Sequence, residues 1–408
     1  MTELFRDFLQ TEQAAELTKI IDSLKGDTLK IHSSLSKRSD KEQILPYLPD
    51  MLLLRDLREK AEKKFSQAPN MFFTRRGLEQ STGENIAEHK ASWISTDAKV
   101  LVLCSGIGGE MISLAKKAQH VTAVDNDAEI CEVAALNADA YSVKNKITFI
   151  NDTVEHFLEK YNGEGFDAVY IDPDRRPGDS RKVELSQYLP NIYEILPQLL
   201  KISKDIYCKV SPRIFRDELT KIQNLSSYEF IQEDQDLKEC VLHFTPLADD
   251  ITKIATKISN NTAIHLYSKE SQSHKQILLD EKAVKLYLFE PYACVMRAEL
   301  VEQCAENIDG IFLAEKGALL TSDILSETGK DWGTYFEICT VLPFHPATIK
   351  TYCKDNALDK IIIKKRYFPL EPHEIRKFLK IKEGGNDIFY CTTLADKKVI
   401  IHCRRVLP

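Results

Sequence analysis

The sequence predicts an α/β protein: a doubly wound parallel sheet with helices on both faces, preceded by a helical region and followed by an α+β region. Three observations support this prediction. Apolar residues recur at helical spacing up to about residue 95, apolar runs alternate with helical segments from residue 98 to about 268, and strand-like and helical runs mix after residue 280. We therefore predict four domains, which cover residues 1–95, 96–278, 279–330 and 331–408.

The composition is that of an ordinary globular protein. Of the 408 residues 43% are hydrophobic, and the net charge of -7 argues against a polybasic protein that coats nucleic acid. None of the ten cysteines forms C-x-x-C and no histidines have the spacing H-x-x-H, so we expect reduced cysteines and no metal site. The N-terminal segment lacks the apolar stretch of a signal peptide, and no apolar run approaches about 18 residues. These features favour a cytoplasmic protein without a membrane span.

The helical region comes first. Its apolar residues follow a helical period in four stretches, at 4–10, 16–24, 48–65 and 83–94. Clusters of glycine, proline and β-branched residues are few there. This pattern predicts a helical N-terminal domain.

The α/β region begins with the run 98–104, whose continuous apolar character is typical of a buried parallel strand. Further predicted strands lie at 121–125, 146–152, 166–172 and 205–210, and predicted helices lie between them at 111–118, 128–141, 153–161 and 185–202. We expect the alternation to continue through the runs 239–244 and 262–267. Repeated βαβ units of this kind predict a parallel sheet.

Four successive strand ends carry glycine or an acid. Gly106 and Gly108 follow the first strand, and Asp125, Asp152 and Asp172 end the next three. Ligands of open parallel sheets bind beyond the carboxyl ends of the strands, so these residues predict a ligand crevice. Asp125, 19 residues after Gly106, is placed to accept hydrogen bonds from ribose hydroxyls. For Asp152, capping of the next helix explains the sequence equally well.

The glycine loop lacks the third glycine of the dinucleotide fingerprint. With Gly106 and Gly108 as the first two glycines of G-x-G-x-x-G, the third would fall at position 111, which holds Met111. Gly109 stands two positions before it. A nicotinamide-dependent oxidoreductase is therefore disfavoured.

The segments VLVLCSGIGGE, VTAVDND, ITFIND and VYIDPDRR together resemble the motifs of class I S-adenosylmethionine-dependent methyltransferases. The resemblance covers roughly residues 98–268 and implies a Rossmann-like core that binds S-adenosyl-L-methionine. The cofactor-binding residues that it implies are Cys104, Ser105, Gly106, Gly108, Gly109, Asp125, Asn126, Asp152 and Thr153.

The same resemblance implies a role for each part of this set. The glycines pass under the methionine part of the cofactor, and Asp125 binds its ribose. Asn126, Asp152 and Thr153 lie near its adenine. The chain departs from the family pattern at Val102, where many such enzymes have an acid.

The segment IDPDRRP resembles the D/N-P-P-Y/F motif of methyltransferases that act on exocyclic amines of bases. By this resemblance Asp172 and Pro173 are catalytic, because the carboxylate and a backbone carbonyl hold the amine. Asp174 replaces the second proline of the motif and Arg175 replaces the aromatic residue. We expect Arg175 and Arg176 to contact substrate, by stacking on a base or by holding a phosphate. Ion pairs with nearby acids are the alternative.

The next predicted strand ends with Cys208 and Lys209. Methylation of carbon 5 of a pyrimidine needs a nucleophilic cysteine, and Cys208 is the candidate nearest to the motif. Its apolar neighbours indicate a buried structural thiol instead. We expect Lys209 to touch substrate, unless it only closes the strand.

More narrowly, FTRRGLEQSTGENIAEHKASWI, DPDRRP and EPYACVMRAEL, with later segments, resemble bacterial methyltransferases that have a THUMP-like C-terminal domain. This resemblance implies a small ferredoxin-like unit in the third predicted domain and a THUMP-like unit, a type associated with RNA, in the fourth. It also implies that Phe73 and Thr74 cover the cofactor, with plain packing as the alternative. Residues 360–408 contain twelve Lys or Arg and five Asp or Glu, a net charge of +7 that is the compositional hint of a polyanion partner, although a solvated basic face explains the charge at least as well.

The sequence thus predicts an S-adenosylmethionine-dependent methyltransferase that acts on a base in RNA, with an exocyclic amine favoured. Two alternatives stay open. The first is a methyltransferase for a protein or a small molecule. The second is a non-catalytic RNA-binding protein with a degenerate methyltransferase fold, which Val102 favours and which Asp125 and the glycine loop disfavour.

Overall fold

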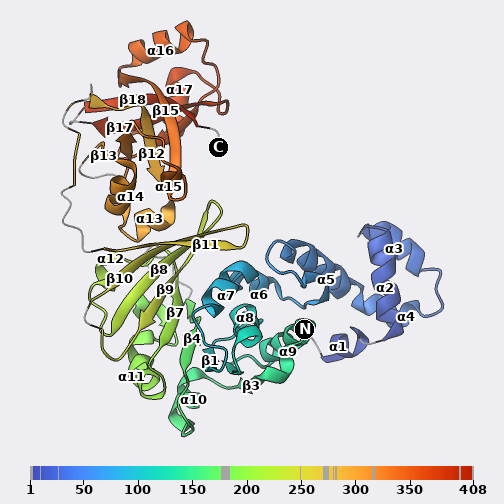
Figure 1. Cartoon of the computed structure of the whole chain (residues 1–408). Helices are drawn as coiled ribbons and strands as arrows, with labels where there is room; N and C mark the ends of the chain where they lie inside the picture. Colours follow the sequence, from blue (N-terminus) through green and yellow to red (C-terminus); the bar gives the residue numbers. More distant parts are fainter. Residues whose placement is uncertain are drawn as a thin grey trace. The chain divides into compact units, whose positions relative to one another are not determined.

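The structure is a computed structural model that describes residues 3–9, 11–25, 27–175, 184–248, 250–269, 275–278, 280, 283–314, 318–394 and 397–406. The chain forms two compact units (Figure 1). Unit 1 contains Met1–Asn224 and Leu242–Ala248, and unit 2 contains Leu225–Val241 and Asp249–Pro408. In the described part of the chain, no helix has the length and apolar character needed to cross a membrane.

Helices fill the N-terminal part of unit 1, as the sequence predicts. They are α1 (Glu3–Leu9), α2 (Glu12–Ser23), α3 (Thr28–Leu35), α4 (Lys41–Ile44), α5 (Leu48–Ala61), α6 (Arg75–Gln80) and α7 (Glu84–Ala91). Thr11 and Asp27 cap α2 and α3, where each side chain accepts a backbone N–H at 3.2 Å. Leu17 and Ile31 are fully buried in the shared core of the first helices, drawn in blue in Figure 1.

Five parallel strands form the sheet of unit 1. They are β1 (Lys99–Leu103), β2 (His120–Asp125), β3 (Ile147–Asn151), β4 (Ala168–Ile171) and β7 (Ile206–Val210). Their order is β7-β4-β1-β2-β3, with every neighbouring pair parallel. The chain runs outward from β1 to β3 on one side and from β4 to β7 on the other. The crevice between the carboxyl ends of β1 and β4 is therefore the switch point, where sheets of this kind bind ligands.

Helices connect these strands. They are α8 (Gly109–Lys117), α9 (Ala128–Ala140), α10 (Val154–Lys160) and α11 (Ile192–Ile202). Side chains of one face of β1, such as Val100 and Val102, share a buried core with Ala115 of α8 and Ala134 of α9. Because parallel crossovers are right-handed, reversal of the strand order at β1 places α11 on the opposite face. The strands predicted up to residue 210 are thus confirmed, and so are the helices, except that the helix predicted at 185–202 begins only at Ile192 and is preceded by a 3-10 turn (Leu185–Gln187) and a short strand (Tyr188–Leu189).

After β7 the structure differs from the predicted alternation. The short helix α12 (Arg216–Leu219) is followed by four strands, which are β8 (Leu225–Glu233), β9 (Asp236–Phe244), β10 (Thr252–Ser259) and β11 (Thr262–Tyr267). The described residues contain no helix between them. The reason is turn chemistry: Asn260 and Asn261 both have positive φ, at 49° and 60°, and close β10 and β11 as a two-residue hairpin. In unit 2 these strands lie in the order β11-β10-β8-β9.

A second sheet makes up the rest of unit 2. Its strands are β12 (Tyr287–Pro291), β13 (Ile311–Phe312), β14 (Leu320–Ser322), β15 (Gly333–Pro343), β16 (Ile362–Lys365), β17 (Asp387–Leu394) and β18 (Lys397–Arg405). They lie in the order β13-β14-β12-β15-β18-β17-β16. The third and fourth predicted domains thus contribute strands to one sheet, and the predicted domain boundaries themselves stay predictions.

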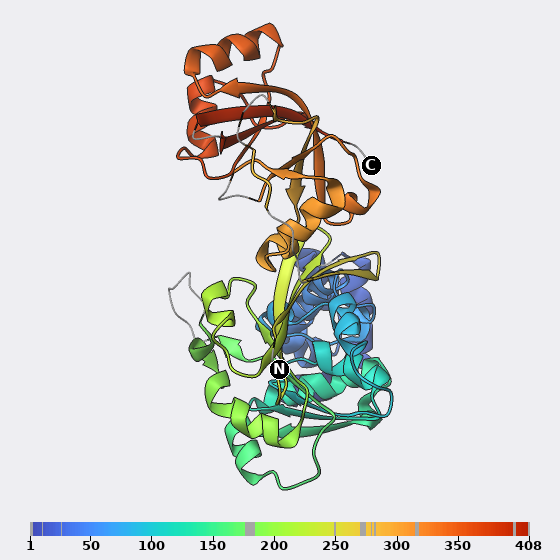
Figure 2. The ribbon, with the colours of Figure 1, turned by 60° about the vertical axis from the view of Figure 1, so that its left-hand side comes forward.

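Both faces of this second sheet are covered. The helices of the region are α13 (Ala293–Arg297), α14 (Val301–Ile308), α15 (Glu327–Lys330), α16 (Pro346–Asp355) and α17 (Pro372–Leu379). Successive side chains of β17 alternate between two cores: Phe389 packs with α16 and α17, whereas Tyr390 packs on the other face. Figure 2 shows α16 and α17, in orange to red, against one side of this sheet. The α+β character predicted for this region is confirmed.

Candidate active site

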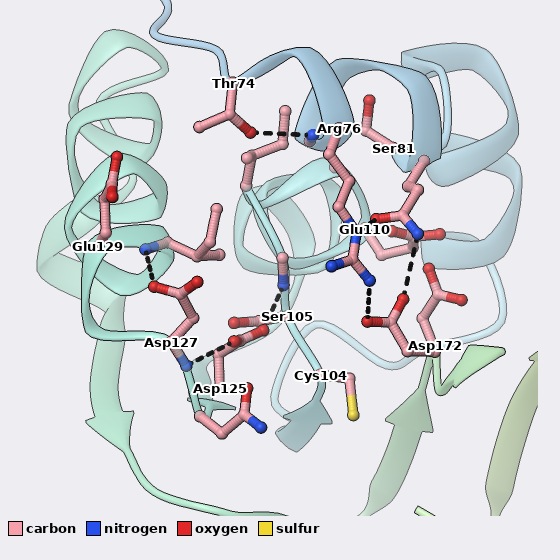
Figure 3. Close-up of a pocket in the computed structure, with 18 of the residues that line it drawn as sticks. Thr74, Arg76, Ser81, Cys104, Ser105, Glu110, Asp125, Asp127, Glu129 and Asp172 are labelled. Carbon is pink, nitrogen blue, oxygen red and sulfur yellow. Dashed lines mark hydrogen bonds and ion pairs between the residues drawn. The ribbon is translucent and has the colours of Figure 1, made fainter. Parts of the chain in front are cut away.

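A cavity of about 420 Å³ lies at the carboxyl ends of β1, β2 and β4 in unit 1 (Figure 3). Its walls are the glycine loop after β1, residues 125–127 after β2 and residues 172–174 after β4. Thr74 and helix α6 form a further wall. The volume falls in the range of small-molecule sites, and the position is the predicted switch point.

Most of the predicted site residues line this cavity. From the predicted cofactor set these are Cys104, Ser105, Gly106, Gly109, Asp125 and Asn126, and the predicted catalytic residues Asp172 and Pro173 lie there too. Gly108, Asp152, Thr153 and Lys209 are not among the lining residues. The structure therefore brings three strand ends together around one cavity, and the role of each residue in it stays a prediction.

The glycine loop needs glycine for two different reasons. Gly106 has φ +53°, and a Cβ there would meet no atom within 4 Å, so the backbone conformation alone requires glycine. Gly108 has φ +100°, and its Cβ would lie 2.9 Å from Cε of Met111. Cys104 also has a positive φ, 56°, although it carries a side chain. Such strained backbone is typical of ligand sites.

Asp125 organises the glycine loop. Its Oδ2 accepts the backbone N–H of Gly106 at 2.9 Å, and its Oδ1 accepts that of Asp127 at 3.1 Å. Burial raises the pKa of Asp125 above its ordinary value. A carboxylate can accept about four hydrogen bonds, so both oxygens keep capacity for hydroxyl groups of a ligand.

Asp152 and Thr153 have helix-terminal roles. Thr153 is the N-cap of α10 and accepts the backbone N–H of His156 at 3.2 Å. The carboxylate of Asp152 lies 2.7 Å from Nδ1 of His156. The N-cap of α10 is thus Thr153 and not Asp152, which the capping alternative named, while contact of either residue with adenine stays a prediction.

A chain of alternating charges runs into the protein from Asp172. Lys209 Nζ lies 2.7 Å from Asp172 Oδ2 and 3.6 Å from Glu110 Oε1. On the far side, Lys90 Nζ lies 3.0 Å from Glu110 Oε1 and donates to the Tyr170 hydroxyl at 2.7 Å. The side chains of Lys90 and Glu110 are only 1% and 8% exposed. Because the charges alternate in sign, each buried ion faces a partner.

This arrangement shifts the pKa values of Glu110 and Asp172 in opposite directions. Burial opposes ionisation of Glu110, but the ammonium groups of Lys90 and Lys209 outweigh it and lower the pKa of Glu110. For Asp172 burial dominates and, with the nearby Glu110 carboxylate, raises the pKa to about 6 against the attraction of Lys209. Glu110 thus stays ionised, whereas Asp172 titrates close to neutral pH.

Helix α6 is hydrogen-bonded to Asp174, in the segment that follows Asp172. Arg76 Nη2 donates to Asp174 Oδ2 at 2.7 Å, and Gln80 Nε2 donates to Asp174 Oδ1 at 3.2 Å, as Figure 3 shows for the labelled Arg76. A Cβ on Gly77 would lie 2.5 Å from Cγ2 of Ile107, so α6 packs tightly on the glycine loop. Helix α6 therefore contacts two of the cavity walls.

The remaining predicted residues are placed differently. Thr74 lines the cavity as the N-cap of α6, whereas Phe73 is buried in a neighbouring core. The backbone of Arg175 lies in β5 (Asp174–Arg175), which pairs with β6 (Tyr188–Leu189). Arg176 lies outside the described residues. Substrate contact by either arginine stays a prediction.

Cys208 is a fully buried thiol. Burial raises its pKa well above the ordinary value, and the charge of Asp172 adds to this. A thiolate is the reactive form of cysteine, and a raised pKa suppresses it. The sequence-based interpretation of Cys208 as a structural residue therefore agrees with its surroundings.

Sequence reasoning missed Glu110, Lys90, Arg76 and Gln80. Glu110 follows the glycine loop directly, where an acid in the first turn of a helix is ordinary. Arg76, Gln80 and Lys90 lie in the segment FTRRGLEQSTGENIAEHKASWI, which carried the family resemblance without assigning them a role. Only the spatial arrangement shows that Arg76 and Gln80 bind Asp174 and that Lys90 and Glu110 are linked to Asp172 through Lys209.

Two family models match segments of the chain. Residues 97–209 match the family described as RNA cap guanine-N2 methyltransferase, and residues 333–405 match the family described as THUMP domain-like. The first segment contains the glycine loop, Asp125 and Asp172. The second contains strands β15 to β18 of unit 2.

Curated relatives match over part of their length. An uncharacterized RNA methyltransferase of Mycoplasma mobile is 31% identical over 142 residues, which is 35% of this chain and 36% of that protein. The 23S rRNA (uracil(1939)-C(5))-methyltransferase RlmD of Vibrio parahaemolyticus is 29% identical over 120 residues, which is 29% of this chain and 27% of that protein. The chain thus spans about a third of the length of these relatives.

A solved structure matches nearly the whole chain. It is the crystal structure of a Porphyromonas gingivalis W83 protein with a provisional methyltransferase assignment, and the two share a TM-score of 0.76 and 22% identity over 96% of this chain and 99% of that one. The TM-score over nearly the whole chain establishes that the two proteins share a fold. The chain therefore has the class I methyltransferase fold that its motifs predict, with a THUMP domain-like segment in unit 2.

Proposed function

We propose that the protein is an S-adenosyl-L-methionine-dependent methyltransferase that acts on RNA, with an exocyclic amine of a base as the favoured acceptor. One observation carries the proposal. Asp172 stands at the end of β4 on the rim of the switch-point cavity, held by Lys209, opposite the glycine loop and Asp125. The family match of residues 97–209 and the names of the partial relatives support RNA as the substrate class.

The cavity residues fit the proposed cofactor. S-adenosylmethionine carries a sulfonium and an ammonium group against one carboxylate, so it is a net cation, and the cavity is lined by acids that include Asp125, Asp127 and Asp172. Gly106 leaves open space beside the loop, and Asp125 keeps acceptor capacity for the ribose hydroxyls. Val102 is buried in β1 and its side chain offers no polar atom, so another lining acid, such as Glu110 or Asp172, would have to face the ammonium group of the cofactor.

The bound cofactor would supply an activated methyl group on sulfur. The side chains then need only to orient the acceptor nitrogen toward it, which is catalysis by positioning. Asp172 is suited to this because Lys209 fixes Oδ2, while Oδ1 has no hydrogen-bond donor among the described residues. Oδ1 would accept one N–H of the amine and so direct the lone pair of the nitrogen. The cofactor would supply the methyl group and keep the C–S electron pair on its sulfur, and Oδ1 of Asp172 or water would take the proton that the alkylated nitrogen releases.

Methylation of carbon 5 is not supported by this geometry, although RlmD of Vibrio parahaemolyticus carries that reaction in its name. That chemistry needs a thiolate beside the base. Cys208 is fully buried and its pKa is raised. Cys104 lines the cavity, but burial raises the pKa of its thiol as well. An amine acceptor is therefore favoured.

The proposal is tested by calorimetric titration of the full chain with S-adenosylhomocysteine. The wild-type protein should bind at micromolar concentration, and Asp125→Ala should weaken binding at least tenfold because it removes the ribose acceptor. Asp139→Ala is the matched control, since Asp139 is an exposed acid on α9 away from the cavity. Absence of binding by the wild-type protein would contradict the proposed activity.

A further inference from the structure

The glycine loop after β1 carries a buried apolar side chain, Ile107, which is only 2% exposed. Ile107 shares a core with Val133 of α9 and with Leu57, Phe65 and Leu78. The last three belong to the N-terminal helical region, which we define as the residues before β1. The loop is thus packed against this region, although the region is not part of the parallel sheet.

The side chain of Asn137, on α9, joins the same loop to the helical region by hydrogen bonds. Its Nδ2 donates to the backbone carbonyl of Ile107 at 2.9 Å and to that of Phe72 at 3.0 Å, and its Oδ1 accepts the backbone N–H of Phe72 at 2.7 Å. Two carbonyls on one side and an N–H on the other allow only this orientation of the amide. Asn137 is fully buried, so the loss of its side chain leaves three buried backbone groups without their partner.

Phe72 lies in the segment that leads into a wall of the cavity. Thr74, two residues later, lines the cavity and caps α6 (Figure 3). From α5, Arg58 Nε donates to the backbone carbonyl of Met71 at 2.8 Å, and its guanidinium carbon lies 5.1 Å from the centre of the Phe72 ring. Asn137 and Arg58 therefore hold this segment from two helices, and only Asn137 also holds the glycine loop.

We propose that Asn137 is a positioning residue for the cofactor and that the N-terminal helical region fixes the shape of the glycine loop through it. This inference rests on the proposed function, because S-adenosylmethionine is the ligand proposed for the loop. Asn137 is not among the residues that line the cavity, so it acts through Ile107 and Phe72.

The need for such a residue follows from the backbone of the loop. Gly106 and Gly108 both have positive φ, and glycine backbone can adopt many other conformations, so contacts with neighbouring elements must select this one. A loop that held its binding conformation only about a tenth of the time would bind its ligand about tenfold more weakly.

Tyr141 offers a matched control. It directly follows α9, and its hydroxyl donates to Glu84 Oε2 at 3.0 Å and accepts the backbone N–H of Gln67 at 3.4 Å. Both partners belong to the helical region, and neither belongs to the glycine loop. Tyr141→Phe and Asn137→Ala therefore both remove hydrogen bonds between α9 and the helical region, but only Asn137→Ala also releases the loop.

The test is calorimetric titration of the full chain and of both variants with S-adenosylhomocysteine, at a temperature where circular dichroism shows each protein to be folded. Asn137→Ala should weaken binding about tenfold, and Tyr141→Phe should change it by less than about twofold. Hydrogen–deuterium exchange of peptides that contain residues 105–109 should be faster in Asn137→Ala alone. A merely structural Asn137 would lower the melting temperature and leave both the affinity and this exchange unchanged, which would overturn the proposal.

A second pair of variants applies if Asn137→Ala does not fold. Ile107→Val removes one methyl group from the loop, whereas Val133→Ala removes two carbons from the same core on α9. Ile107→Val should weaken binding of S-adenosylhomocysteine about threefold, and Val133→Ala should weaken it less despite the larger loss of packing. An affinity of Ile107→Val equal to that of the wild-type protein would overturn the proposal.

The two possible failures are distinguishable in the same titrations. Wild-type binding of S-adenosylhomocysteine that neither Asn137→Ala nor Ile107→Val weakens rejects this inference alone and leaves the proposed function standing. Absence of binding by the wild-type protein rejects the proposed function and this inference with it.

Discussion

At the scale of single residues, the pair Asp172 and Lys209 determines the expected pH dependence. Burial raises the pKa of Asp172 to about 6, and only the ionised form can both accept an amine N–H and take up the proton that the alkylated nitrogen releases. Activity should therefore fall about tenfold per pH unit below pH 6. Asp172→Asn should lower the rate and remove this acidic limb. The measurement is kcat/KM against pH, and a profile that is flat from pH 5 to 8 in the wild-type protein would contradict the assigned role.

The same raised pKa has a consequence for stability. The folded protein holds a proton on Asp172 at pH values where the unfolded chain has released it, between the ordinary value of 3.8 and about 6. The contribution of Asp172 to the free energy of unfolding is therefore fully present below about pH 3.8 and is lost as the pH rises through about 6. Asp172→Asn should flatten this part of the stability profile relative to the wild-type protein.

A second residue-scale prediction concerns the buried pair of Lys90 and Glu110. Lys90→Met leaves the Glu110 carboxylate buried without its nearest cation, which should lower the free energy of unfolding by about 3–5 kcal/mol. The double variant Lys90→Met, Glu110→Gln should recover part of this loss because no buried charge remains. Urea denaturation measures both. A cost below about 1 kcal/mol for the single variant would show that Lys209 alone compensates Glu110.

The strand-end residues could be predicted from the sequence because each follows an apolar run directly. Asp125 and Asp172 line one cavity, as their positions predicted. Lys209, the partner of Asp172, was among the predicted site residues, but the buried pair of Lys90 and Glu110 behind it could not be predicted. Lys90 is 80 residues away from Tyr170 along the chain, and the contact between them depends on how α7 packs on the sheet. No sequence motif indicates contacts of this kind.

At the scale of secondary structure, the tight packing of α6 on the glycine loop gives a further prediction. Gly77→Ala places a Cβ 2.5 Å from Cγ2 of Ile107, so either α6 or the loop must shift. We expect binding of S-adenosylhomocysteine to weaken about tenfold, since a displaced loop loses its orientation. Calorimetry measures the effect. Gly83→Ala is the control, because its Cβ would meet its nearest atom at 3.8 Å. Equal affinities of the two variants would show that the loop does not depend on α6.

The sequence predicts the elements of the parallel sheet better than those that follow it. Up to residue 210 strands and helices alternate, and the hydrophobic pattern alone identifies them. Beyond β7 the expectation of continued alternation is wrong, since β8 to β11 follow one another. The signal was present in Asn260 and Asn261, which stand between two strand-like runs and favour a hairpin. In this region the turn residues predict the order of the strands better than the apolar runs do.

At the scale of the whole molecule, the acidic N-terminal part and the basic C-terminal part of the chain agree with different roles for two cavities. Six acids and Arg76 line the cavity of unit 1. Lys364, three arginines that include Arg405, and the acid Glu290 line a cavity of about 670 Å³ in unit 2. Arg405→Ala should therefore raise the KM for RNA about tenfold and leave kcat within about twofold, since it weakens binding without touching the reacting atoms. Steady-state methyl transfer measures this split. A fall in kcat with an unchanged KM would contradict a docking role.

The sequence predicted the class of fold and the basic character of the C-terminal part, but it could not predict the second cavity. Glu290, Lys364 and Arg405 come from three strands that are distant in sequence, and only the strand order places them together. Composition shows how many charges a segment has. It does not show which of them face a common space.

The most direct test of the central claim is analysis of RNA nucleosides from cells that lack the protein. This RNA is incubated with the purified chain and S-adenosylmethionine and is then analysed by mass spectrometry. We predict that a base methylated on an exocyclic nitrogen is missing from this RNA, that the wild-type protein restores it, and that Asp172→Ala does not. A restored base methylated on carbon 5, or an RNA that the wild-type protein leaves unchanged, would contradict this prediction.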